Sequence, residues 1–118
     1  MSYDLDFWKY KDKSNQDHQK TYEALSDGET LDSVEELPIE KMKERVAELF
    51  SSGWERLDDL TWEAGSDDRG SFQLFTTAQF FRVDCYGMEG DDMNHFIDIG
   101  VEFGCPLYDP QVSQRYDG

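Results

Sequence analysis

The chain has 118 residues, of which 11 are Lys or Arg and 27 are Asp or Glu, so its formal net charge at pH 7 is −16. This length fits one domain, residues 1–118, and a 14% share of aromatic residues supplies enough apolar surface for a folded core. Nucleic acid is excluded as a partner, because the chain would repel its phosphates and has no dense basic patch. The same negative field attracts basic proteins and speeds their encounter.

The N-terminal residues 1–10 contain no apolar segment of the secretory signal-peptide kind, and no apolar run is long enough to span a membrane. We therefore expect a cytoplasmic protein without a membrane partner. In that compartment Cys85 and Cys105 should stay reduced, and we expect both to be buried thiols.

The first third of the chain predicts one strand and one helix. The period-2 pattern of a half-buried strand covers Tyr3–Lys9. One side of that strand carries Tyr3, Leu5 and Phe7, and the other carries Asp4, Asp6 and Trp8. A short helix is expected over Asp17–Ser26, with Asp17 as its cap and Ser26-Asp27-Gly28 as its end.

The middle of the chain contains the strongest helical pattern. From Ile39 to Phe50 the apolar residues form one arc after Pro38, with Glu40, Glu44 and Glu48 on the opposite side. The helix should end at Ser52-Gly53. Residues 54–63 have a mixed pattern, which we interpret as a turn that leads into a strand near Leu60–Ala64.

The last part predicts a hairpin, a helix and a strand. The hairpin pairs Ser71–Thr76 with Gln79–Tyr86 across Thr77-Ala78. After a break at Gly87–Gly90, a third helix should be capped by Asp91 or Asp92 and end before Gly104. Its predicted apolar face consists of Met93, Phe96, Ile97, Ile99, Gly100 and Phe103. A short strand follows over Cys105–Tyr108, stopped by Asp109-Pro110.

These elements follow one another in the order βααβββαβ. We therefore predict an α+β fold in a single domain, with a mainly antiparallel sheet and about three helices. The order contains the split β-α-β layout of a ferredoxin-like sandwich, with an extra helix and an extra strand.

The sequence contains no motif that predicts catalysis, a cofactor or a metal site. His95 shares a helical stripe with carboxylates that would repel a phosphate diester, so we expect His18 and His95 to be ordinary surface residues rather than an acid–base pair. Cysteines and histidines lack zinc-site spacing, and the acidic turns do not fit a calcium-binding loop. Carboxylates already occupy the start of the third helix, where a phosphate could otherwise bind. We expect a binding protein rather than an enzyme.

The distribution of acidic residues is the main functional signal. Thr21–Glu40 contains seven acidic residues and no Lys or Arg, and so does Val83–Gln114. A charged run is usually just a solvated surface, but several unneutralised stretches favour a basic partner that relieves their repulsion. On the third helix Asp91, His95, Asp98 and Glu102 form one stripe through their 4-3-4 spacing.

The predicted partner-binding residues combine that stripe with neighbouring acidic turns and one aromatic residue: Glu35, Glu36, Asp58, Asp59, Asp67, Asp68, Asp91, Asp92, His95, Asp98, Glu102 and Tyr108. Exposed aromatic residues beside acidic ones would strengthen such a surface, because interface cores favour Tyr and Trp. Trp54, Trp62 and Tyr116 are further candidates, although packing in the core is an equally good prediction for the two tryptophans.

Three segments, Met1–Trp8, Ser71–Thr76 and Phe103–Gln111, resemble small bacterial proteins that include immunity proteins of polymorphic and contact-dependent growth inhibition toxin systems. The resemblance implies a cytosolic protein that neutralises a cognate toxin domain, commonly a basic nuclease, by covering its active site or a neighbouring surface. The alternative is an acidic adaptor or nucleic-acid mimic that binds a basic housekeeping protein.

Overall fold

The structure is a computed structural model that describes residues 2–11, 17–65, 70–111 and 114–116. Its elements in chain order are β1 (Ser2–Phe7), α1 (His18–Ser26), α2 (Ile39–Leu49), β2 (Trp54–Asp58), β3 (Thr61–Ala64), β4 (Ser71–Thr77), β5 (Phe80–Tyr86), α3 (Gly90–Glu102), β6 (Leu107–Asp109) and β7 (Gln114–Tyr116). The strands form one sheet in the order β2-β3-β4-β5-β1-β6-β7, and every neighbouring pair is antiparallel. The predicted α+β class with a mainly antiparallel sheet is confirmed.

The centre of the sheet has the predicted split β-α-β layout. Strands β6, β1, β5 and β4 are neighbours in that order, so β1 separates the two strands that α3 connects. The β2–β3 hairpin extends one edge of the sheet and β7 extends the other. None of the helices in the described ranges is long and apolar enough to cross a membrane.

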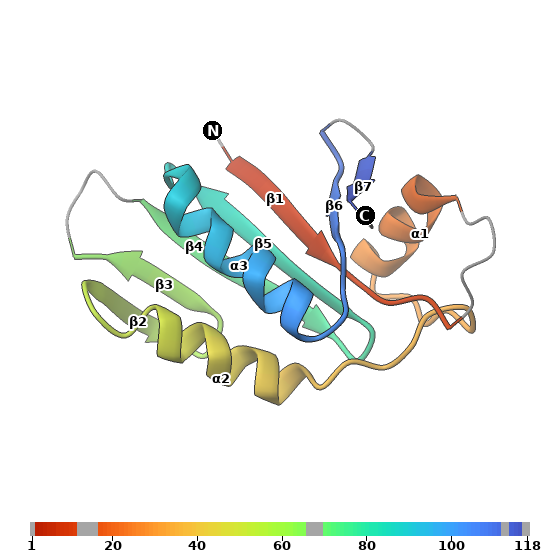
Figure 1. Ribbon diagram of the computed structural model, residues 1–118, viewed down its shortest axis with the longest axis horizontal. Coiled ribbons are helices and arrows are strands. Elements are labelled where there is room, and N and C mark those ends of the chain that lie inside the picture. Colours follow the sequence, from red (N-terminus) through yellow and green to blue (C-terminus); the bar gives the residue numbers. More distant parts are fainter. Residues whose placement is uncertain (1, 12–16, 66–69, 112–113, 117–118) are drawn as a thin grey trace.

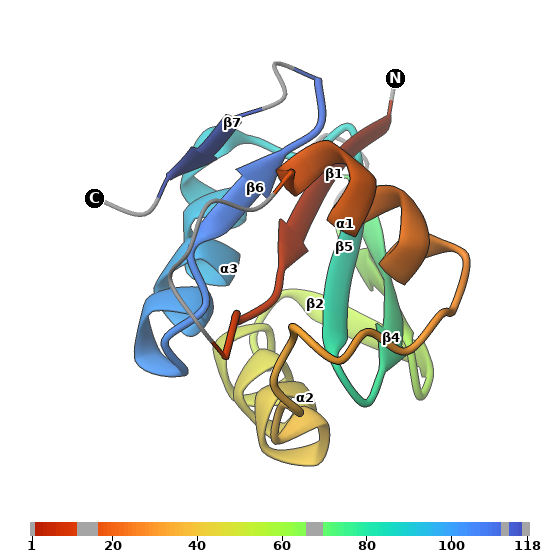
Figure 2. The ribbon, with the colours of Figure 1, turned by 90° about the vertical axis from the view of Figure 1, so that its right-hand side faces the viewer.

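Helices cover both faces of the sheet, and we name the faces by them. Helices α2 and α3 lie side by side on what we call the first face, whereas α1 lies on the opposite, second face (Figures 1 and 2). The first face holds the larger apolar cluster, in which the Phe50 ring stacks on Phe96 at 5.0 Å and packs against Phe72 at 4.7 Å. Gly100 lets α3 approach β1, because a Cβ there would lie 2.6 Å from the Phe7 ring.

The second face holds a smaller cluster beneath α1 and the segment before α2. Its fully buried members are Trp8, Leu25, Val34, Phe80 and Tyr108. Gln79 in the β4–β5 turn fixes that segment, because its Nε2 donates to the carbonyls of Leu31 and Val34 at 2.7 and 2.8 Å. Its Oε1 also accepts from the Leu31 N–H at 2.8 Å.

The predicted helices correspond closely to the observed ones, with one corrected start. Asp17 caps α1 by accepting a hydrogen bond from the Lys20 N–H, as expected. Helix α3 begins at Gly90 with Glu89 at its N-cap, and no side chain caps it. The expectation that Asp91 or Asp92 is the cap is therefore wrong.

The strands differ more from the prediction. Strand β1 is buried on both faces rather than on one, because α1 covers Asp6 and Trp8 on the second face. The sequence pattern predicts a turn where β2 lies, because the register of β2 shifts between Arg56 and Asp58 and this breaks the alternation of its side chains. The three-residue strand β7 was not predicted. The hairpin turn contains Ala78 and Gln79, one residue later than expected.

Candidate protein-binding surfaces

The predicted acidic stripe lies on the outer side of α3, but only part of it carries unneutralised charge. Asp91 and Asp98 are exposed, and no Lys or Arg within the described ranges forms an ion pair with either. Glu102 accepts a hydrogen bond from Arg45 Nε on α2 at 3.0 Å, so its charge is matched. The His95 ring is half-buried, with its centroid 5.5 Å from that of Phe50. The stripe is therefore reduced to two free carboxylates.

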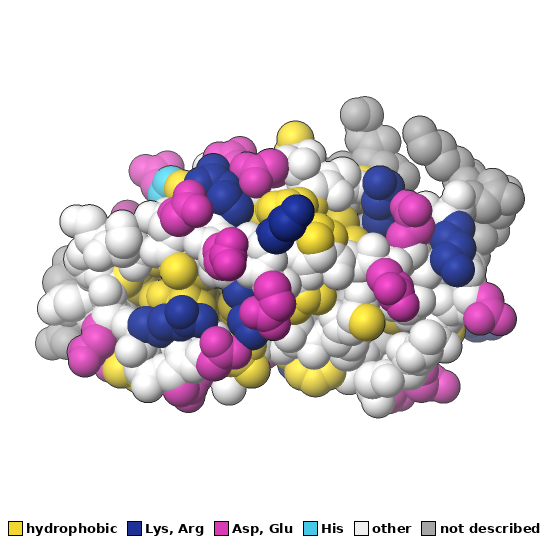
Figure 3. Space-filling model, turned by 90° about the horizontal axis from the view of Figure 1, so that it is seen from below, with side chains coloured by type: hydrophobic (Ala, Val, Ile, Leu, Met, Phe, Trp, Pro, Cys, Tyr) yellow, Lys and Arg dark blue, Asp and Glu magenta, His cyan; other side chains and the backbone are white. Residues whose placement is uncertain are grey.

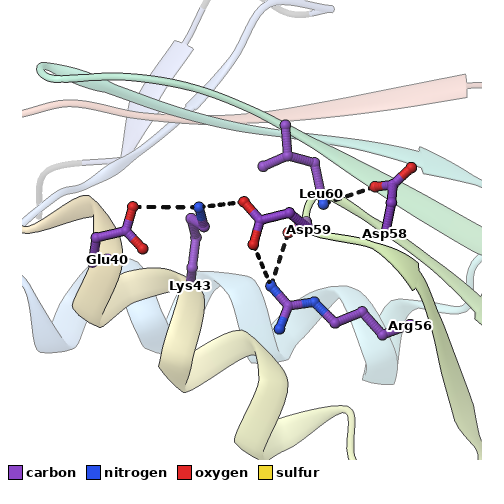
Figure 4. Close-up of polar contacts among 6 residues, drawn as sticks. All are labelled: Glu40, Lys43, Arg56, Asp58, Asp59 and Leu60. Atoms are coloured by element: carbon purple, nitrogen blue, oxygen red, sulfur yellow. Dashed lines mark hydrogen bonds and ion pairs between the residues drawn. The ribbon is translucent and has the colours of Figure 1, made fainter.

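Several acidic residues on α2 and in the β2–β3 turn are paired with basic ones. Lys43 Nζ lies 2.6 Å from Asp59 Oδ2 and 3.4 Å from Glu40 Oε1, and Arg56 also donates to Asp59 (Figure 4). The hydrogen bond between Lys43 and Asp59 raises the pKa of Lys43 and lowers that of Asp59. Basic and acidic side chains alternate over this side of the molecule (Figure 3). Its net field is therefore weaker than the sequence suggests.

The remaining predicted acidic residues are scattered. Glu35 forms an ion pair with Lys9 at 3.6 Å, and it lines a shallow open depression of about 390 Å³ together with Glu36. Asp58 accepts a hydrogen bond from the Leu60 N–H at 2.8 Å, which fixes the β2–β3 turn. Asp67 and Asp68 lie outside the described residues.

Two of the predicted binding residues are buried, which corrects their expected exposure. Tyr108 has no exposed surface, because its ring packs on Trp8 at 5.1 Å and its hydroxyl donates to Gln19 of α1. Asp92 is only 6% exposed and faces inward from α3. Trp62 is also buried, whereas Trp54 keeps part of its surface. Neither Tyr108 nor Asp92 presents a side chain to a partner in this structure.

A group of carboxylates on the second face was not predictable from the sequence, and we call it the Asp4–Asp6–Asp84 cluster. Asp4 and Asp84 are direct cross-strand partners on β1 and β5, and Asp6 is the partner of Arg82. Arg82 Nε lies 3.0 Å from Asp84 Oδ1. Tyr22 of α1 donates its hydroxyl to Asp4 at 3.1 Å. The cluster therefore lies at the border of the part of the second face that α1 covers.

Asp6 is the unusual member of this cluster. It has no exposed surface, and neither of its carboxylate oxygens has a hydrogen-bond partner in the described structure. Burial raises the pKa of Asp6 from 3.8 to about 8, and the neighbouring charge of Asp4 adds to the effect. At neutral pH this carboxyl therefore holds a proton.

Neighbouring groups show the same influence of burial. The pKa of Asp84 is raised by burial and, to a smaller extent, by its contact with Asp4. Burial raises the pKa of Tyr22 to about 12, and the charges of Asp6 and Asp4 act in the same direction. The alternation of residues 3–8 did place Asp4 and Asp6 on one side of a strand. The missing information was that a helix from elsewhere in the chain covers that side.

Both cysteines are buried free thiols, as expected. Burial raises the pKa of Cys85 to about 12 and that of Cys105 to about 11, so both are protonated and unreactive at neutral pH. Within the described ranges, no group of three His, Cys, Asp or Glu side chains is arranged to hold a metal ion. Comparisons of the chain with protein-family models, with curated proteins and with solved structures gave no match.

Proposed function

We propose that the protein acts in the cytoplasm, where it binds a cognate basic toxin domain and neutralises it in a stoichiometric complex. The net charge of −16 supports a basic partner, because opposite fields steer two proteins toward each other. The resemblance to immunity proteins supports a toxin as that partner, and a nuclease is the kind of toxin that it implies.

The single observation that carries this proposal is the unneutralised outer surface of α3. Asp91 and Asp98 are exposed there and form no ion pair with a described Lys or Arg, whereas Glu40, Glu48 and Asp59 are all paired with Lys or Arg. Val101, which is 72% exposed, lies three residues after Asp98 and therefore beside it on the helix. An apolar side chain next to free carboxylates suits a surface that contacts a basic partner with some desolvation.

The test begins with the gene that encodes the partner. A neighbouring gene for a large secreted protein with a basic C-terminal domain identifies the candidate toxin, whose domain is then expressed with and without this protein. Protection of the host cells and a one-to-one complex are the expected results. An isolated gene, together with capture of a basic housekeeping protein, would favour the adaptor instead.

Charge-matched variants then locate the contact. Asp91→Asn with Asp98→Asn should slow association with the toxin domain at least several-fold, and added salt should slow it further. Glu29→Gln with Glu44→Gln removes two exposed charges elsewhere and is the control. Glu102 is left unchanged, because its charge is already paired with Arg45. Equal rate changes in the two variants would show that net charge alone governs association, and no change in either would contradict the α3 contact.

A further inference from the structure

Part of the second sheet face is not covered by any described element. Trp62, Phe72 and Cys85 face the first-face cluster, so the alternate residues of β3, β4 and β5 point to the second face. Among these alternate residues Glu63, Gln73 and Tyr86 are exposed, and so is Glu55, the partner of Glu63 on β2. We call Glu55, Glu63, Gln73, Tyr86 and the Asp4–Asp84 pair the open sheet surface.

Like charges face each other at two places on the open sheet surface. Glu55 is the direct cross-strand partner of Glu63, and Asp84 is that of Asp4. Directly opposed like charges destabilise a sheet. In the described structure Arg82 is placed against the Asp4–Asp6–Asp84 cluster, but it already forms an ion pair with Asp84.

The buried carboxyl of Asp6, on the same face of β1 as Asp4, is a second, independent sign that a binding partner is missing here. Its two oxygens lack hydrogen-bond partners in the described structure although the side chain is completely buried. Burying a polar group without a partner costs free energy that a protein normally avoids. Asp6 lies two residues after Asp4 on the same face of β1. A positive charge bound at the Asp4–Asp84 pair would therefore attract the ionised form of Asp6.

The open sheet surface also offers an aromatic contact. Tyr86 is 44% exposed and lies at the end of β5, two residues from Asp84 on the same face. An exposed Tyr beside carboxylates can contact both the aliphatic stem and the charged head of a Lys or Arg side chain.

We propose that the open sheet surface is a docking site for a lysine- or arginine-bearing segment of a partner protein. Charge complementarity selects this occupant, since the surface repels nucleic acid and its carboxylates are not arranged around a metal site within the described ranges. The inference rests on the proposed function, which supplies the positive charge of the partner. The docking site itself lies on the opposite face of the sheet from α3.

Deca-lysine is a suitable probe, with Asp6 as the local reporter. The Asp6 carboxyl is titrated by ¹³C NMR with and without a saturating amount of the peptide. A bound ammonium group near the Asp4–Asp84 pair should lower the pKa of Asp6 by roughly one pH unit. If the protein is saturated with deca-lysine and the pKa of Asp6 does not change, the peptide binds elsewhere and the inference is overturned.

Two charge-matched variants provide the control. Glu55→Gln with Glu63→Gln should raise the Kd for deca-lysine at least about threefold. Asp91→Asn with Asp98→Asn should change the Kd less, although it removes the same charge. All four side chains are exposed, so both variants should fold, which amide NMR spectra would verify. Equal changes, or a larger change in the α3 variant, would refute the sheet site.

The outcomes separate this inference from the proposed function. If deca-lysine binds the open sheet surface but the protein protects against no toxin, the docking site stands and the toxin proposal fails. If the protein protects through α3 and the Glu55/Glu63 variant binds deca-lysine normally, the toxin proposal stands and the docking site fails.

Discussion

The two faces of the sheet are covered in different ways. On the first face α2 and α3 cover one apolar cluster, which includes Trp62 of β3 and Cys105. On the second face α1 covers a smaller aromatic cluster, leaves carboxylates at its border and does not reach Glu63 or Gln73. We infer that the two faces have different roles. The first face supplies most of the free energy of unfolding, whereas the second face holds polar groups that lower it.

The largest effect should come from the first face. Phe72 is fully buried against Phe50, Trp62 and Phe96, so Phe72→Ala should lower the free energy of unfolding by about 3–5 kcal/mol. Phe75 on the same strand faces the second face and is only half-buried, so Phe75→Ala should cost at most about 2 kcal/mol. Urea unfolding measures both, and equal losses would remove the distinction between the faces.

Asp6→Asn should stabilise the protein. Because the folded-state pKa of about 8 exceeds the ordinary value of 3.8, the folded protein keeps a proton that the unfolded chain has released between these pH values. Stability should therefore fall as the pH rises from about 4 to 8 on account of this group. The variant lacks that fall and should gain about 1–3 kcal/mol at pH 7.5.

Thermal unfolding at several pH values would measure this gain, with Asp98→Asn as the exposed control. The difference between Asp6→Asn and the unchanged protein should shrink as the pH falls below about 4, where the unfolded chain also protonates Asp6. A difference that does not vary with pH would show that Asp6 is ionised in the folded protein.

Gln79→Ala should have a smaller effect, confined to the second face. It removes three hydrogen bonds that hold Leu31 and Val34, and two carbonyls lose their partner, so we expect a loss of about 1–3 kcal/mol. Hydrogen exchange should quicken in the segment before α2 and not in α3. Gln73→Ala, at an exposed position of the neighbouring strand, is the control and should be nearly neutral.

Salt should produce the smallest change. Screening of the −16 net charge should raise the melting temperature between low and physiological ionic strength, by the equivalent of about 1 kcal/mol or less. The rise should be reduced in the Glu55→Gln, Glu63→Gln variant, which lacks one opposed pair. A flat response in the unchanged protein would mean that local ion pairs already neutralise most of the carboxylates.

The fold was predictable where a local pattern is strong. The arc from Ile39 to Phe50 predicted α2, and the run from Ser71 to Tyr86 predicted the β4–β5 hairpin. Strand β2 escaped prediction because it is an edge strand with a register shift and only Trp54 packs into the core. Strand β7 is too short for a periodic pattern, and it forms through pairing with β6.

The candidate surfaces were less predictable, because charge pairing depends on tertiary contacts. Glu102 and Asp59 belong to acidic patches in the sequence, but Arg45 and Lys43 reach them from α2. The burial of Tyr108 depends on α1, which lies far away in the chain. Asp6 is one acidic residue among 27, and only the packing of α1 on β1 distinguishes it.

The position of β1 has a consequence for how the protein is synthesised. Strand β1 is synthesised well before its pairing partners β5 and β6. Until β5 and β6 have emerged from the ribosome, Leu5, Phe7 and Trp8 therefore have no sheet to join. We expect the nascent chain to depend on its high charge, or on a chaperone, to stay unaggregated until β6 has emerged.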